Sequence, residues 1–382
     1  MMRRGLLWLV VTALAGLLVV VAPPASADEA SLAASGTDAH STWGALKDRA
    51  TWVRRPVLKQ RGFADPSVVR WHGTYVGVAT GRLAPRAKAL SPAGPWRAAG
   101  TALARRPRWA SGRNLWAGDL VRVGRRWVLY FAAPVRGLGP NGRCIGVAVA
   151  RKPTARFHPV GGGPLVCPRA AHTPRAGDPM VGRGAALPQR GAIDAESFRA
   201  GRRRYLVYRT QGRPSTIRMV RLSGDGLRAR RGGASRQLVR APHIVENPVL
   251  LRRGRGYVLL ASEGSYGDCD YRTTWRRTTH LWDWSHARAH RLLDRAGTGL
   301  CGPGGADVVD SRALRRRTAH RALIVLHAWT CPGLGTCRSG DYRLDPTPGA
   351  RRSMYAAWLW WSRGRPYVTS FVLPTRLARP DM

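Results

Sequence analysis

The chain has 382 residues, with 64 Lys and Arg against 21 Asp and Glu, which gives a formal net charge of +43 at pH 7. A charge of this size attracts polyanions. The arginines are scattered along the chain, however, and no nucleic-acid-binding module is visible, so nucleic acid is not an expected partner. Two interpretations of the charge stay open: an anionic wall polymer is a partner, or the arginines simply occupy solvated basic positions.

The first 27 residues have the features of a secretory signal peptide. A basic start, MMRR, precedes an almost wholly apolar run over residues 5–21 and a small-x-small cleavage site that ends at Ala27. We therefore expect cleavage after Ala27 and a secreted, extracellular protein. The apolar run is nearly long enough to cross a bilayer, so an uncleaved membrane anchor is the alternative.

The six cysteines all follow this segment, and their number is even. In an exported chain this favours disulfides over free thiols. Of the pairings that are formally open, we expect the neighbours in sequence to be joined: Cys144 with Cys167, Cys269 with Cys301, and Cys331 with Cys337. The sequence has no CxxC motif, and His286 and His290 stand without other metal-binding residues nearby, so no metal site is predicted.

Short β-prone runs, separated by turns rich in glycine, fill the rest of the chain. The run 68–71 is expected to pair with 75–78, and the run 249–251 with 257–260, each across a tight turn. No long segment shows the 3.6-residue period of a helix, so the predicted class is all-β. We expect a polar lead-in over residues 28–55 and a single domain over 56–382.

Five acidic residues each stand about ten residues ahead of a strand-like run. They are Asp65, Asp119, Asp194, Glu246 and Asp307. In a chain so poor in acids, this spacing indicates a rough repeat in which each unit directs one acid to a common centre. A five-bladed β-propeller builds a polar centre in this way. Carboxylates gathered in one pocket are also what a glycosidase needs.

The residues around these acids resemble the motifs of glycoside hydrolase family 43. The segments that carry the resemblance are ADPSV (64–68), WAGDL (116–120), IDAESF (193–198), VENPVL (245–250), CGPGGADVV (301–309), LHA (326–328) and RSMY (352–355). They occur in the family's order and extend over about residues 55–375. Members of this family are five-bladed propellers that remove arabinose, xylose or galactose units with inversion, so the resemblance implies that fold and activity here.

The resemblance also implies catalytic roles. Asp65 would be the general base that activates water, Glu246 the general acid, and Asp194 the residue that positions Glu246 and raises its pKa. A base must be ionised and an acid protonated at the same pH, so their surroundings must separate their pKa values. A neighbouring carboxylate has this effect through like-charge repulsion. Inversion further requires the carboxyl groups of Asp65 and Glu246 to lie roughly 6.5–9.5 Å apart.

Four further residues are candidates for substrate binding. Trp116, close to Asp119, is the preferred aromatic contact for a sugar ring. Asp119 and Asp307 are expected either to bind sugar hydroxyls or to tie blade to blade. His327 lies in an apolar strand, where it is either a core histidine or part of the site. Glu196 shares a strand face with Asp194 and is a second candidate for the pocket.

Three departures from the family motifs indicate a pocket that differs from those of known arabinosidases and xylosidases. Asn247 replaces a glycine, Ala195 replaces a proline, and the segment 305–307 lacks a histidine. Tyr266 and Tyr271, in the loop after the strand that carries Glu246, are expected to border the pocket.

The predicted function is that of a secreted, monomeric, inverting glycoside hydrolase acting on polysaccharides or oligosaccharides that contain arabinose or xylose. No cofactor is expected to be required, although the resemblance leaves a structural calcium ion on the axis open. One alternative is a non-catalytic propeller that binds carbohydrate or a polyanion. Another is a retaining, fructan-type enzyme of the same fold, in which the two carboxyl groups would be only about 5 Å apart.

Overall fold

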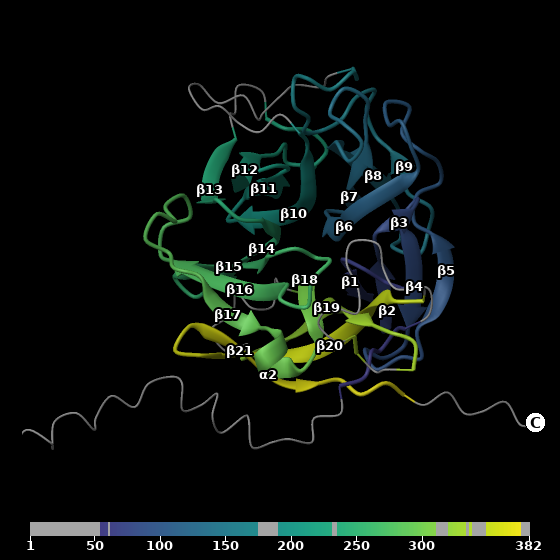
Figure 1. The fold of residues 1–382 in the computed structure, drawn as a ribbon. Helices are drawn as coiled ribbons and strands as arrows, with labels where there is room; N and C mark the ends of the chain where they lie inside the picture. The colour runs from purple at the N-terminus through teal and green to yellow at the C-terminus, as the bar shows by residue number, and fades with distance from the viewer. Residues whose placement is uncertain are drawn as a thin grey trace, which may run out of the picture. The chain divides into compact units, whose positions relative to one another are not determined.

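A computed structural model describes residues 54–59, 62–174, 190–230, 235–310, 320–333, 336–337 and 349–375. Within these ranges five antiparallel sheets are arranged around one axis (Figure 1). The predicted all-β class and five-bladed β-propeller are therefore confirmed. The predicted signal peptide, and the lead-in up to residue 53, lie outside the described residues. No described helix is long and apolar enough to span a membrane.

The sheets follow one another along the chain, and each forms one blade. Blade 1 contains β1 (Ser67–Trp71), β2 (Thr74–Val78), β4 (Pro85–Ala89) and β5 (Arg97–Thr101). Blade 2 contains β3 (Gly81–Arg82), β6 (Asn114–Val123), β7 (Arg126–Pro134), β8 (Arg143–Ala150) and β9 (His158–Pro159). Blade 3 contains β10 (Ala192–Ala200), β11 (Arg203–Thr210), β12 (Ser215–Arg221) and β13 (Arg236–Ala241).

The last two blades have the same four-stranded plan. Blade 4 contains β14 (Val245–Arg253), β15 (Gly256–Glu263), β16 (Arg272–Thr278) and β17 (His290–Leu293). A short helix, α2 (Arg295–Thr298), leads to blade 5, which contains β18 (Cys301–Val309), β19 (Arg321–Thr330), β20 (Arg351–Ser362) and β21 (Arg365–Phe371). The first long strand of each blade lies nearest the centre and the last lies at the rim (Figure 1).

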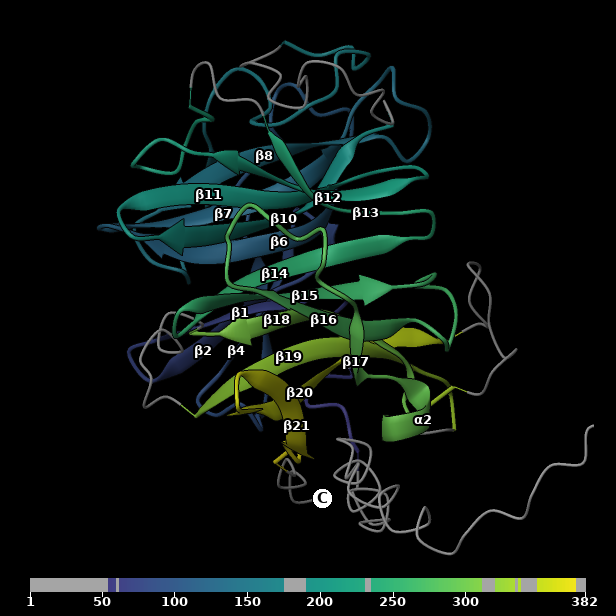
Figure 2. The same cartoon turned by 90° about the vertical axis from the view of Figure 1, so that its left-hand side faces the viewer.

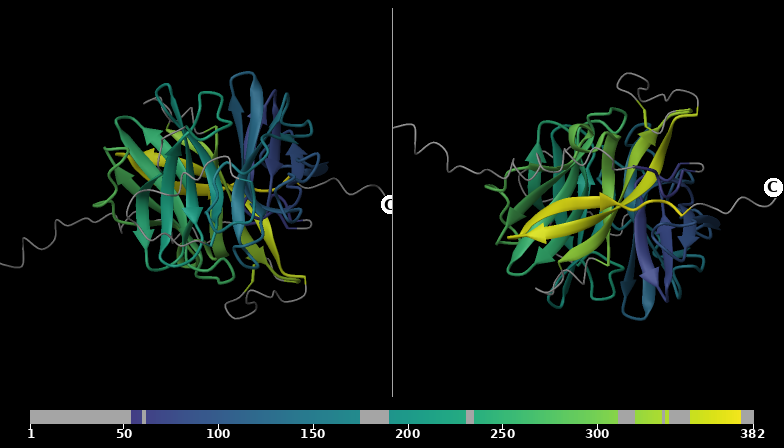
Figure 3. Two further views of the ribbon diagram at one scale, coloured as in Figure 1. Left: turned by 90° about the horizontal axis from the view of Figure 1, so that it is seen from above. Right: turned by 90° about the horizontal axis from the view of Figure 1, so that it is seen from below.

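The ring closes where the two ends of the domain meet. Leu58 forms an isolated bridge with Met354 of β20, and the backbone N–H of Phe63 donates to the carbonyl of Arg352 at 2.7 Å. Figure 3 shows the C-terminal strands of blade 5, in yellow, beside the first strands of blade 1, in purple and blue. The side view in Figure 2 shows the sheets of successive blades packed face to face.

Burial on both faces explains why the middle strands are almost wholly apolar. Five core clusters lie one between each pair of adjacent blades. Because successive residues of a strand point to opposite faces, β7 supplies two of these clusters: Leu129 and Phe131 pack against blade 1, and Val128 and Tyr130 pack against blade 3. Each blade is therefore stabilised by both of its neighbours.

The predicted hairpins are present in the expected register. Arg70 pairs with Tyr75 in blade 1, and Leu250 pairs with Leu259 in blade 4. The turn of the second hairpin contains Gly254, with φ of 58°, in the left-handed region that two-residue hairpin turns require. Tight turns rich in glycine thus set the strand boundaries that the sequence indicated.

The structure joins the six cysteines as the neighbour pairs expected from the sequence: Cys144–Cys167, Cys269–Cys301 and Cys331–Cys337. The first pair lies within blade 2, the second links the loop after β15 to the start of β18, and the third closes the end of β19. Each bond therefore fixes a segment next to a strand end.

Candidate active site

Every blade has one residue in the left-handed conformation where its first long strand meets the axis. These residues, called the axial positions below, are Asp65 (φ 49°), Ala117 (37°), Asp194 (56°), Asn247 (47°) and Gly305 (58°). In blades 2 to 5 the pairing register shifts at this point, which marks a β-bulge. A bulge redirects a side chain and is common beside active sites.

One cavity lies among the axial positions. Its lining includes all five of them and, in four of the five blades, the residue two positions further along the chain: Ser67, Glu196, Val249 and Asp307. Asp65 from blade 1 and Asp194 from blade 3 are thus brought together, as the sequence predicted. Glu246 precedes the axial position of blade 4 by one residue and is buried, with 7% of its surface exposed. It is not among the residues that line the cavity.

Asp65 is held by hydrogen-bond donors from three other parts of the chain. Thr80 Oγ1 donates to its Oδ2 at 2.7 Å, Asn247 Nδ2 donates to its Oδ1 at 3.2 Å, and Arg352 Nη1 lies 3.3 Å from Oδ2. Burial by itself would raise the pKa of Asp65, but Arg352, the neighbouring His327 and the two hydrogen bonds together outweigh it, so the pKa lies below its ordinary value. The carboxylate is therefore ionised at neutral pH.

His327 of β19 lies directly behind this carboxylate and is fully buried. The backbone N–H of Asp65 donates to its Nδ1 at 3.1 Å. Burial lowers the pKa of His327 to about 3, so the ring is neutral and its proton is on Nε2. That Nε2 has no hydrogen-bond partner among the described residues. Through the contact with the Asp65 backbone N–H, His327 holds the base-bearing residue in place, and a role for His327 beside a metal ion stays a prediction.

Asp194 and Glu246 form a pair of interacting carboxyl groups. Glu246 forms a buried ion pair with Arg209 of β11, and Tyr271 Oη donates to its Oε1 at 2.8 Å. The pKa of Asp194 lies well above its ordinary value, because of burial first and the charge of Glu246 second. Two close carboxylates do not both ionise readily, so the pair retains a proton.

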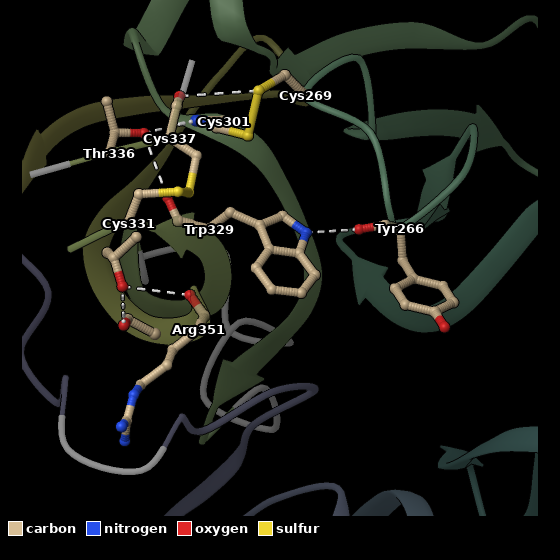
Figure 4. The surroundings of a disulfide bond; sticks show 10 residues. Tyr266, Cys269, Cys301, Trp329, Cys331, Thr336, Cys337 and Arg351 are labelled. Carbon is tan, nitrogen blue, oxygen red and sulfur yellow. Dashed lines mark hydrogen bonds between the residues drawn. A yellow bond between two sulfur atoms is a disulfide. The ribbon is translucent and has the colours of Figure 1, made fainter. Parts of the chain in front are cut away.

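A disulfide supports the loop that carries Tyr271. Cys269 is bonded to Cys301 (Figure 4), and the backbone N–H of Gly302 donates to the carbonyl of Cys269 at 3.0 Å. Nearby, Trp329 Nε1 donates to the carbonyl of Tyr266 at 2.7 Å. The guanidinium carbon of Arg352 lies 4.8 Å from the centre of the Tyr266 ring. Neither Tyr266 nor Tyr271 is among the residues that line the axial cavity, so their border role stays a prediction.

A second layer of polar residues ties the blades together around the axis. In three blades the side chain two residues after the axial position accepts a backbone N–H from the next blade. The ties are Ser67 Oγ with Leu120 N (3.1 Å), Asp119 Oδ2 with Ser197 N (2.8 Å) and Asp307 Oδ2 with Val68 N (3.0 Å). Of the two roles considered for Asp119 and Asp307, these contacts favour the structural one.

Removing one tie is expected to reduce stability. Asp119→Ala leaves the N–H of Ser197 without this charged acceptor, and the expected loss is about 2 kcal/mol of unfolding free energy. Asp119→Asn keeps an acceptor oxygen and should lose much less. Chemical denaturation of both variants measures the difference. Two variants as stable as the parent, combined with a loss of sugar binding, would assign Asp119 to the substrate instead.

Glu196 from the same layer lines the cavity. Burial, followed by the charges of Asp119 and Asp307, raises the pKa of Glu196 well above its ordinary value. Burial also raises the pKa of Asp307 to about 6. The second candidate for the pocket is therefore present there.

Trp116, the predicted sugar contact, precedes the axial Ala117 and is half-buried. The guanidinium carbon of Arg143 lies 3.4 Å from the centre of its ring. Arg143 therefore makes a cation–π contact with the Trp116 ring. Stacking of a sugar on this ring stays a prediction. Among the described residues no group of three or more His, Cys, Asp or Glu side chains is placed to hold a metal ion. A structural calcium ion also stays a prediction.

Sequence reasoning missed three residues that contact the acids: Thr80, Arg209 and Arg352. Two of them carried a signal. Arg209 is only 8% exposed in the otherwise apolar run YLVYRT, and Arg352 begins the RSMY segment whose next residues are buried. A basic residue in a buried strand requires a partner, and the available partners in this chain were the few acids. Thr80 carried no such signal.

The fold and the site together define a class. A five-bladed propeller whose axial cavity contains two carboxyl groups with pKa values shifted in opposite directions has the equipment of a glycoside hydrolase. The sequence matches the family model described as "Glycosyl hydrolases family 43" over residues 53–333. The chain therefore belongs to glycoside hydrolase family 43, and it is a glycoside hydrolase.

Solved structures share the fold at low sequence identity. A thermostable family-43 glycoside hydrolase is 18% identical, with 84% of this chain and 95% of that chain covered and a TM-score of 0.60. The α-L-arabinanase of Cellvibrio cellulosa is 19% identical, with 83% and 100% covered and a TM-score of 0.59. An endo-1,4-β-xylanase of Bacteroides thetaiotaomicron is 15% identical, with 84% and 98% covered and a TM-score of 0.59. No curated protein sequence was found to match.

Proposed function

We propose that this protein is a secreted, inverting glycoside hydrolase that cleaves polysaccharides or oligosaccharides containing arabinose or xylose. The observation that carries the proposal is the opposite shift of the two acids in one cavity: the pKa of Asp65 is lowered and that of Asp194 is raised. An ionised base and a protonated acid at the same pH are what single-step hydrolysis requires.

In the proposed reaction Asp65 is the general base. Its carboxylate removes a proton from water while the water oxygen forms a bond to the anomeric carbon. The bond from that carbon to the leaving oxygen breaks, and this oxygen receives a proton from the pair formed by Glu246 and Asp194. We assign the transfer to Glu246, as the family resemblance implies, and assign Asp194 to keeping the pair protonated. The 6.5–9.5 Å separation of Asp65 and Glu246 is part of this proposal.

The substrate class rests on the relatives. One structural neighbour is an α-L-arabinanase of Cellvibrio cellulosa complexed with arabinohexaose, at 19% identity, and another is an endo-1,4-β-xylanase. The extracellular location is supported by the three disulfides, since such bonds persist in oxidising compartments.

The purified protein should be tested on aryl glycosides of arabinose and xylose and on arabinan and arabinoxylan. We expect release of reducing sugar from at least one of them, and NMR of the first product should show the inverted anomer. A product with retained configuration would favour the retaining alternative. Binding of a glycan without any cleavage would favour the non-catalytic alternative.

A groove at the outer edge of blades 4 and 5 favours a second activity, the binding of an anionic polymer. Its lining consists of Trp275, Arg277, His286, Ala287, Arg288, His290 and Arg365. Five of these seven residues are basic, and none is acidic. Electrophoresis through gels that contain polygalacturonate should show retardation of the protein, reduced in an Arg277→Gln/Arg365→Gln double variant. Equal retardation of both proteins would exclude this groove as the binding site.

A further inference from the structure

Asn247 contacts two of the three proposed catalytic acids at once. Its side-chain Nδ2 donates to Asp65 Oδ1 at 3.2 Å, and its backbone N–H donates to Asp194 Oδ2 at 3.0 Å. It belongs to blade 4, whereas the two acids belong to blades 1 and 3. A single residue thus connects the carboxyl group proposed as the base with the one proposed to keep the acid protonated.

The backbone conformation does not by itself explain an asparagine here. Asn247 has φ of 47°, a left-handed value that glycine adopts at no steric cost and that asparagine tolerates better than most residues. The bulge therefore restricts the choice to a few residue types. Among them asparagine adds an amide, and that amide is directed at Asp65.

We propose that Asn247 is a positioning residue for the hydrolytic reaction, which holds the Asp65 carboxylate in place and in its charged form through its side-chain amide. The proposal rests on the function proposed above for Asp65. A donor N–H stabilises a carboxylate more than a carboxylic acid. Thr80 and Arg352 act in the same direction from other sides, so the amide is one of three donors that together offset the burial of this group.

The two contacts of Asn247 can be separated by mutation. The backbone N–H remains in any variant except proline, so the contact with Asp194 persists while the side chain is changed. Asn247→Gly removes the amide and suits the left-handed backbone. Asn247→Asp keeps the side-chain shape but replaces the donor with a carboxylate next to Asp65 and Asp194.

The pH dependence of kcat/KM is the measurement. Asn247→Gly should lower kcat/KM at the optimum by about tenfold. It should also move the acid limb of the profile to higher pH by about one unit, since the pKa of Asp65 rises when a donor is lost. Asn247→Asp should move the limb at least as far, because a second charge then repels that of Asp65. Asn141→Gly, in an exposed turn of blade 2, is the matched control and should leave the profile unchanged.

The outcomes separate this inference from the proposed function. A parent enzyme without glycosidase activity would refute both. An active, folded Asn247→Gly or Asn247→Asp variant with an unmoved acid limb would refute the role of Asn247 alone, even if kcat/KM falls equally at every pH. Thermal unfolding of each variant establishes that it is folded, and the second variant serves if the first does not fold.

Discussion

Replacing Asp65 with asparagine is expected to lower kcat/KM by about 10²–10⁴-fold, the usual contribution of a general base. The variant keeps the size of the side chain but loses the charge that accepts a proton from water. Activity should be measured on the best substrate from the screen, together with thermal unfolding. Asp283→Asn, at an exposed loop position, is the matched control and should retain full activity.

The difference in unfolding free energy between the parent and Asp65→Asn should decrease as the pH is lowered. Because the folded-state pKa of Asp65 is lowered, its ionised form adds stability above its unfolded-state pKa, and this stability is lost as the pH falls through the folded value. The parent and Asp65→Asn should therefore differ in stability at neutral pH and converge in acid. Full hydrolytic activity in Asp65→Asn would remove this residue from the mechanism.

The second large effect concerns the proton donor. Glu246→Gln is expected to lower the hydrolysis of natural glycosides by about 10²–10⁴-fold. It should have a much smaller effect on a dinitrophenyl glycoside, because that leaving group departs without protonation. Comparing kcat/KM for the two kinds of substrate in each variant measures this dependence.

The same comparison distinguishes Glu246 from Asp194. Asp194→Asn should keep the parent's ratio of kcat/KM between the natural and the dinitrophenyl glycoside. It should move the alkaline limb of the pH profile of kcat/KM to lower pH, because the carboxylate of Asp194 no longer favours the protonated form of Glu246. The opposite pattern, with Asp194→Asn active only on the dinitrophenyl glycoside, would make Asp194 the donor.

Because Glu246 is ion-paired with Arg209, Glu246→Gln leaves a buried cation unpaired, which costs about 3–5 kcal/mol. Its unfolding must therefore be measured as well.

The sequence motifs located the acids but not their exact register. The segments ADPSV, IDAESF and VENPVL each contain an acid at the start of a first strand. They look equivalent in the sequence. In the structure Asp65 and Asp194 occupy axial positions, whereas Glu246 precedes Asn247, the axial residue of its blade. In blade 4 the left-handed residue and its β-bulge lie one position after the acid, so Asn247 and not Glu246 lines the cavity. A sequence motif does not show at which residue such a bulge falls.

By itself the sequence determined the fold class, the hairpins and the segments that reach the axis. These depend on local patterns, namely alternation of apolar residues and turn residues, whereas the structure decided which of the formally open cysteine pairings is formed. Only the tertiary structure decided how each acid is charged, since Thr80, Asn247 and Arg352 reach Asp65 from three separate parts of the chain. The pKa of a buried carboxyl group depends on the donors and charges within a few ångströms, and those neighbours are far apart along the chain.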